Sequence, residues 1–148
     1  MRTILLLTLF ISLSGALPAF AQDSQRLDDI NYSFGHFLGK DLQRNAVQLR
    51  IDRLLDGLFD ASEQLEPQYS QEEMQALRSV KQAKEEDILE KINYAYGYKT
   101  GQEIVAAKVE INAELLLFGV TDVTDHKKAR FSVKEMTELL AQLKKDQP

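Results

Sequence analysis

The stretch INYSFGHFLGK (residues 30–40) has the apolar spacing of a helix, yet it contains two glycines four residues apart, Gly35 and Gly39. A glycine inside a helix costs about 0.5–1 kcal/mol relative to alanine. Two glycines on one helical face therefore need a structural reason. The stretch INYAYGYKTGQ (residues 92–102) repeats the pattern further along the chain, with Gly97 and Gly101.

The two stretches belong to a repeat that extends over most of the chain. At a constant offset of 62 residues and without a gap, 14 of the 53 positions from 30 to 82 are identical to their counterparts. The identities fall on glycine, helix-capping and apolar positions together, which chance would not produce. We therefore divide the chain into a leader (1–21), a first repeat (22–85) and a second repeat (86–148).

Each repeat has the pattern of three helices, which predicts an all-α fold. The expected bounds are 28–45 and 89–107 for helix one, and 52–62 and 113–124 for helix two. Helix three starts at a capping box in both copies, formed by Ser70 with Glu73 and by Ser132 with Glu135. A capping box satisfies two backbone amides at the start of a helix, so these starts are well defined.

The junction between the repeats leaves one point open. Residues 70–107 contain no proline, and their first glycine is Gly97, so helix three of the first repeat could continue into helix one of the second. The middle of such a helix, residues 81–87, has almost no apolar side chain. It is therefore either solvated or broken.

The glycine pairs predict a close crossing of two helices. Without Cβ atoms another backbone can approach, as in G-x-x-x-G packing. An interface between two like units needs this notch in both, so we favour a crossing between the repeats over close packing within one. The expected crossing residues are Tyr32, Gly35, Gly39, Gly57, Tyr94, Gly97, Gly101 and Gly119.

An isolated repeat is too small to bury helices one and two on all sides, so the repeats are expected to pair. If the junction bends, they pair within one chain. If it stays straight, two chains must pair instead. We expect pairing within one chain.

The motifs resemble the N-terminal dimerisation domain of FKBP-type peptidyl-prolyl isomerases of the macrophage infectivity potentiator type. That pattern is Y-x-x-G-x-x-x-G in helix one, G-x-x-D-A in helix two and S-x-E-E-M at the start of helix three. The first repeat matches it, whereas the second departs at Val123 and Lys134. Both repeats lack the glycine that usually ends helix two. The resemblance implies an interlaced pair of domains that can cradle unfolded protein clients.

In such isomerases helix three leads into a β-rich catalytic domain, and this sequence has no segment that could form one. The resemblance thus implies a duplicated, non-catalytic module. The favoured hypothesis is a chaperone-like or scaffolding role in protein folding, with protein clients as partners. A regulator that pairs with full-length FKBP-type isomerases is the alternative. An isomerase in its own right would lack its catalytic domain.

Residues 1–21 have the features of a secretory signal peptide: Arg2, an apolar run, and Ala19-Phe20-Ala21 as a cleavage pattern. The run is shorter than the roughly 20 residues of a spanning helix, which disfavours a retained membrane anchor. We expect cleavage after Ala21, a periplasmic location and no membrane span in the processed protein.

Composition and scattered polar residues exclude several other functions. The sequence has 18 Lys and Arg, one of them Arg2, against 23 Asp and Glu, so the processed chain is acidic and poorly suited to nucleic acid. It has no cysteine for disulfides or thiolate chemistry. His36 and His126 occupy non-equivalent positions and are expected on the surface or a helix face. We predict no catalytic, cofactor-binding or metal-binding residue.

Overall fold

The computed structural model describes residues 17–145, and within this range the chain forms helices and no strand. Helix α1 (Leu17–Arg44) begins in the last residues of the predicted leader and continues into the first repeat, which also supplies α2 (Ile51–Ser62) and α3 (Gln71–Ser79). The second repeat supplies α4 (Glu86–Ala106), α5 (Ala113–Thr124) and α6 (Val133–Lys145). The all-α prediction is confirmed. Residues 1–16, most of the predicted leader, lie outside the described residues.

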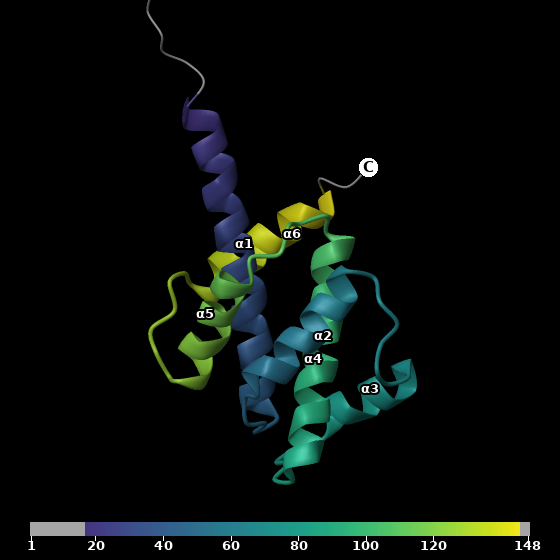
Figure 1. Cartoon of the computed structure of the whole chain (residues 1–148). Helices are drawn as coiled ribbons and strands as arrows, with labels where there is room; N and C mark the ends of the chain where they lie inside the picture. Colours follow the sequence, from purple (N-terminus) through teal and green to yellow (C-terminus); the bar gives the residue numbers. More distant parts are fainter. Residues whose placement is uncertain (1–16, 146–148) are drawn as a thin grey trace, which may run out of the picture.

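The helices of the two repeats interlace. Helix α1 packs against α5, and α2 packs against α4, so each helix one is paired with helix two of the other repeat (Figure 1). Helix α3 lies on α4, and α6 lies on α1. The buried core contains leucines and isoleucines from both repeats: Leu42, Leu54, Leu58, Ile92, Ile104 and Leu116. The predicted pairing of the repeats within one chain is confirmed.

The possible long helix across the junction is not formed. Helix α3 ends at Ser79, Val80 is extended, and Gln82 has a φ of 56°. A continuing helix would join the Gln82 amide to the Arg78 carbonyl. Instead the Tyr96 hydroxyl donates to the Arg78 carbonyl at 3.0 Å, and the Gln82 amide donates to the Asn45 carbonyl at 2.9 Å. Tertiary contacts therefore replace the bond that would have carried the helix onward.

Both predicted capping boxes are present. The hydroxyl of Ser70 accepts from the Glu73 amide at 3.2 Å, and the Glu73 carboxylate accepts from the Ser70 amide at 2.8 Å. Ser132 and Glu135 make the same two bonds at 3.2 and 2.7 Å. These bonds lower the pKa of both glutamates, and the bond from the serine backbone amide has the largest effect. The boxes fix where α3 and α6 begin.

Helix two ends in a left-handed residue in both repeats, although neither residue is glycine. Gln64 has a φ of 57° and His126 a φ of 58°. The next residue in each copy bonds back into the helix: the Leu65 amide donates to the Asp60 carbonyl at 2.8 Å, and the Lys127 amide to the Asp122 carbonyl at 2.7 Å. This is the bonding of a Schellman motif, in which glycine is the favoured residue.

Candidate functional site

The predicted glycines of α1 and α5 lie where these two helices cross. A Cβ added at Gly35 would stand 1.9 Å from the carbonyl oxygen of Leu116. A Cβ added at Gly119 would stand 2.2 Å from the carbonyl oxygen of Tyr32. Gly39, one turn along α1, has more space, since its nearest atom would be the Val120 oxygen at 2.8 Å. At the first two positions backbone meets backbone, so no side chain fits there.

The crossing of α2 and α4 reproduces this arrangement at the equivalent positions. The added Cβ at Gly97 would stand 1.9 Å from the Leu54 oxygen, and that at Gly57 2.1 Å from the Tyr94 oxygen. Gly101 corresponds to Gly39, with its nearest atom at 2.6 Å. The two crossings are therefore related by a pseudo-two-fold axis that exchanges the repeats.

The two predicted tyrosines connect the repeats by hydrogen bonds. The Tyr32 hydroxyl donates to Asp122 at 2.8 Å and accepts from the Arg130 amide at 3.0 Å. The Tyr94 hydroxyl likewise donates to Asp60 at 2.8 Å and accepts from the Gln68 amide at 3.0 Å. Burial, together with the Asp60 carboxylate, raises the pKa of Tyr94 to about 12. Both aspartates thus act as hydrogen-bond partners between helices.

Two asparagines outside the predicted set hold the loops that follow helix one. Asn31 accepts from the Asn112 amide at 2.9 Å and donates to the Glu110 carbonyl at 2.9 Å. Asn93 makes the equivalent pair of bonds, with the Arg50 amide at 2.9 Å and the Gln48 carbonyl at 3.0 Å. The sequence carried a signal for them, because an identical polar residue recurs on the apolar face of both helices.

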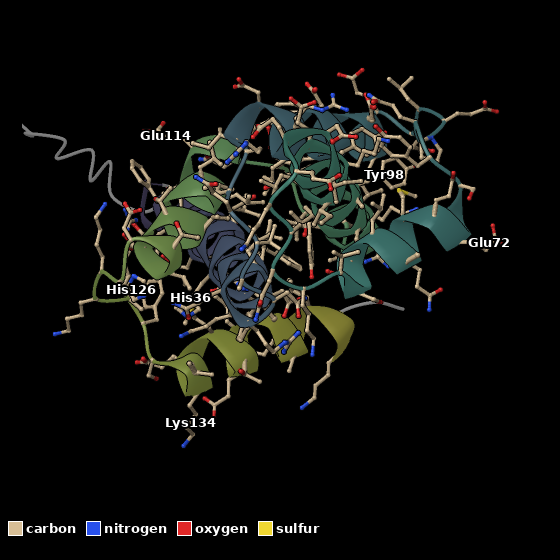
Figure 2. The ribbon with its side chains drawn as sticks, turned by 90° about the horizontal axis from the view of Figure 1, so that it is seen from below. His36, Glu72, Tyr98, Glu114, His126 and Lys134 are labelled. Carbon is tan, nitrogen blue, oxygen red and sulfur yellow. The ribbon has the colours of Figure 1, made fainter. Side chains whose placement is uncertain are left out.

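His36 is not a surface residue, which corrects one reading of the sequence. Its side chain is buried, and neither ring nitrogen has a hydrogen-bond partner in the described structure. Its counterpart Tyr98 is long enough to donate to the Leu65 carbonyl at 3.1 Å. Figure 2 shows the two side chains on opposite sides of the bundle. Burial first, and then Lys40, lower the pKa of His36.

His126 is exposed, with its Nε2 atom 3.5 Å from the side-chain nitrogen of Gln43. Over residues 17–145 no three or more His, Cys, Asp or Glu side chains gather as a metal site would require. In the same range no helix is long and apolar enough to cross a bilayer.

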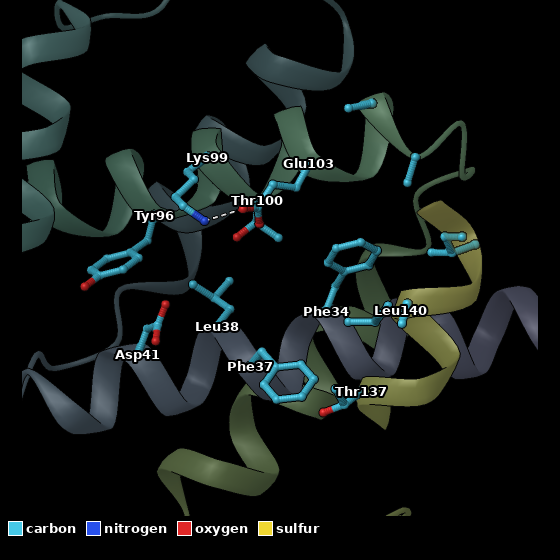
Figure 3. Close-up of a pocket in the computed structure, with 14 residues that line it drawn as sticks. Phe34, Phe37, Leu38, Asp41, Tyr96, Lys99, Thr100, Glu103, Thr137 and Leu140 are labelled. Carbon is cyan, nitrogen blue, oxygen red and sulfur yellow. Dashed lines mark hydrogen bonds and ion pairs between the residues drawn. The ribbon is translucent and has the colours of Figure 1, made fainter. Parts of the chain in front are cut away.

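A cleft of about 850 Å³ lies between α1, α4 and α6 (Figure 3). Helices α1 and α4 contribute equivalent positions to it, so the cleft lies on the pseudo-two-fold axis. The α1 wall consists of Phe34, Phe37, Leu38 and Asp41, and the facing α4 positions are Tyr96, Lys99, Thr100 and Glu103. Helix α6 adds Thr137, Leu140, Ala141 and Leu143. One wall is mainly apolar and the other mainly polar.

The charged groups of the cleft already have partners. Asp41 pairs with Arg44 at 2.6 Å, and Lys99 pairs with Glu103. An occupant would therefore meet chiefly the aromatic and aliphatic side chains of α1 and α6. Such a lining suits an apolar group better than a charged one.

The fold and its crossings define a class of helical module in which two like three-helix repeats interlace within one chain. The family model described as the domain amino terminal to FKBP-type peptidyl-prolyl isomerase matches residues 27–88 and again residues 89–148. The chain belongs to this family and carries two tandem copies of the domain, as its motifs predicted. No model of the FKBP catalytic domain matches it. No curated protein and no solved structure matches the chain.

Proposed function

We propose that this chain is an exported, non-catalytic module of protein folding that binds unfolded protein clients in the cleft on its pseudo-two-fold axis. The observation that carries the proposal is the cleft itself, with Phe34, Phe37 and Leu38 along one wall. The family match supports a link to FKBP-type isomerases. The internal pairing supports a module that is already assembled as a pseudo-dimer.

The arrangement favours this role over pairing with full-length isomerases. A partner domain would need the crossing surfaces of helices one and two. Here the second repeat occupies them, with the Leu116 carbonyl seated against Gly35 and the Leu54 carbonyl against Gly97. Pairing with another protein would require the two repeats to separate first.

Binding to a permanently unfolded protein tests the proposal. Reduced and carboxymethylated α-lactalbumin is a suitable client, because this chain has no tryptophan and the client's tryptophan emission reports binding alone. We expect Phe37→Glu to weaken binding about tenfold, equivalent to about 1.4 kcal/mol. The matched control is Phe59→Glu on α2, whose side chain is 42% exposed outside the cleft. Absence of binding, or equal losses in both variants, would overturn the proposal.

A proline-isomerisation assay tests the non-catalytic part. Uncatalysed exchange of an X–Pro bond takes tens to hundreds of seconds, so even weak catalysis of a short peptide would be visible. We expect the rate to equal that of buffer. Clear acceleration that is blocked by an FKBP-directed macrocycle would show that the chain is an isomerase.

A further inference from the structure

The two copies of helix three are held differently at their C-terminal ends. At the end of α3, the Tyr96 hydroxyl donates to the Arg78 carbonyl at 3.0 Å and accepts from the Asn45 amide group at 2.6 Å. Val80 and Ala83, which follow α3, pack against the core. We call the bonds among Tyr96, Asn45 and the Arg78 carbonyl the Tyr96 cluster. It ties the end of α3 to both repeats.

The second repeat lacks the side chains that make this attachment. The residues at the positions of Tyr96 and Asn45 are Phe34 and Ala107, which have no hydroxyl and no amide group. The positions of Val80 and Ala83 carry Gln142 and Lys145 instead of apolar residues. The C-terminal half of α6 therefore lacks the counterparts of these hydrogen bonds and of Val80 and Ala83, and it contacts the rest of the chain through the half-buried Leu140 and Leu143.

The missing attachment coincides with the cleft. Phe34, Ala107 and Leu140 all line the cleft, and Figure 3 shows Phe34 and Leu140 there. Leu140 is the residue of the second repeat that corresponds to Arg78 of the first. Met136 is fully buried near the start of α6, whereas Leu140 and Leu143 are only half-buried. Helix α6 is thus anchored at its N-terminal end and overhangs the cleft with its C-terminal half.

We propose that α6 is the movable wall of the cleft, pivoting about Met136 to admit an apolar segment of a client, while the Tyr96 cluster keeps α3 in place. This inference rests on the proposed function for the identity of the occupant. The occupant is apolar because the opening uncovers Phe34, Phe37 and Leu38, whereas the rim charges are already paired. The movement itself follows from the difference between the two repeats.

Distances between spin labels on the full chain test the movement. Since the chain has no cysteine, labels can be placed at the exposed positions Gln102→Cys on α4 and Gln142→Cys on α6. The control pair joins Gln102→Cys to Gln75→Cys on α3. In the free protein we expect a broader distance distribution for the α6 pair than for the α3 pair. The unfolded α-lactalbumin client should lengthen only the α6 distance.

A variant that supplies the missing attachment gives the second measurement. Phe34→Tyr with Ala107→Asn places a hydroxyl and an amide group at the positions of Tyr96 and Asn45. We expect a narrower α6 distribution and client affinity lowered several-fold. The mirror variant Asn45→Ala lies outside the cleft lining and removes the amide group of the Tyr96 cluster. It should broaden the α3 distribution without lowering client affinity.

The outcomes separate the two proposals. Equal widths for the α6 and α3 pairs in the free protein would overturn the movable wall. So would a client that binds without lengthening the α6 distance. If the widths differ as expected but no client binds, the movable wall stands and the proposed function fails.

Discussion

The carbonyl oxygen of Leu116 lies 1.9 Å from the point where a Cβ of Gly35 would stand. The second repeat thus presses its backbone into the first at a position that only glycine can occupy. The same relationship joins Leu54 to Gly97 at 1.9 Å. At these two contacts the backbones of the two repeats approach so closely that neither glycine has room for a Cβ.

The variant Gly35→Ala should destabilise the protein. The added methyl group meets rigid backbone, and overpacking of this kind costs about 1–3 kcal/mol, more than the roughly 1 kcal/mol that alanine gains in a helix. Gly39→Ala should cost less, because its added Cβ has 2.8 Å to the nearest atom. Urea unfolding measures both, with the exposed Lys40→Ala as the control. A Gly35→Ala variant as stable as the control would show that the crossing is looser than described.

The variant Asn31→Ala should cost about 1–3 kcal/mol in total. It removes the part-buried hydrogen bonds to the Asn112 amide and the Glu110 carbonyl, and a hydrogen bond of this kind contributes about 0.5–1.5 kcal/mol. Asn93→Ala should have a similar effect, because its two bonds are equivalent. Thermal unfolding tests this, with the exposed Gln102→Ala as control. A melting temperature that stays at the control value in both variants would contradict the role of the asparagines.

Stability should fall when the pH drops below about 6.5, the ordinary pKa of histidine. The pKa of His36 is lowered in the folded protein, so the unfolded chain takes up the proton first and acid favours unfolding. The facing charges are Lys40, which opposes protonation, and Asp122, which favours it. The destabilisation begins near the unfolded pKa and is complete below the folded one.

The variant His36→Phe should remove this part of the pH dependence, measured as the melting temperature between neutral pH and pH about 5. His126→Gln is the control because it removes an exposed imidazole. Its melting temperature should depend on pH in the same way as that of the original chain. Identical profiles for His36→Phe and the control would mean that His36 does not contribute to the pH response.

The variant Gln64→Gly should stabilise the protein by about 0.5–1 kcal/mol. Gln64 has a φ of 57°, and a side chain in the left-handed region carries a steric cost that glycine avoids. The control Gln75→Gly lies inside α3 and should cost about 1 kcal/mol, because glycine weakens a helix interior. Urea midpoints that move in the same direction in both variants would refute the argument.

Much of the fold could be read from local patterns. The capping boxes at Ser70 and Ser132 mark helix starts because a cap is made within four consecutive residues. The crossing glycines could be identified because the repeat shows them twice, and a notch that recurs at equivalent positions indicates an interface between like units. Asn31 and Asn93 were visible as identities, but their bonds depend on where the following loop returns.

Other features depended on groups far apart in the chain. His36 has the sequence pattern of any helix-face histidine, and its burial is seen only in the folded chain. The cleft was not predictable, because it forms where equivalent side chains of α1 and α4 face each other across the axis, with α6 over them. The different attachment of α3 and α6 could also be found only in the structure. Phe34 and Ala107 affect α6 because the fold places that helix beside them.

By itself, the sequence determined that this protein is two copies of one three-helix unit with glycine notches in helices one and two. Those properties arise from contacts within a few residues, or from the repetition itself. The tertiary structure decided that the copies pair within one chain. Residues 80–85 favour a helix, but the two backbone groups that would have continued it bond elsewhere. The Arg78 carbonyl accepts from the Tyr96 hydroxyl, and the Gln82 amide donates to the Asn45 backbone carbonyl. Distant partners outweigh local propensity there, because one helical bond is exchanged for two tertiary bonds and the burial of two repeats.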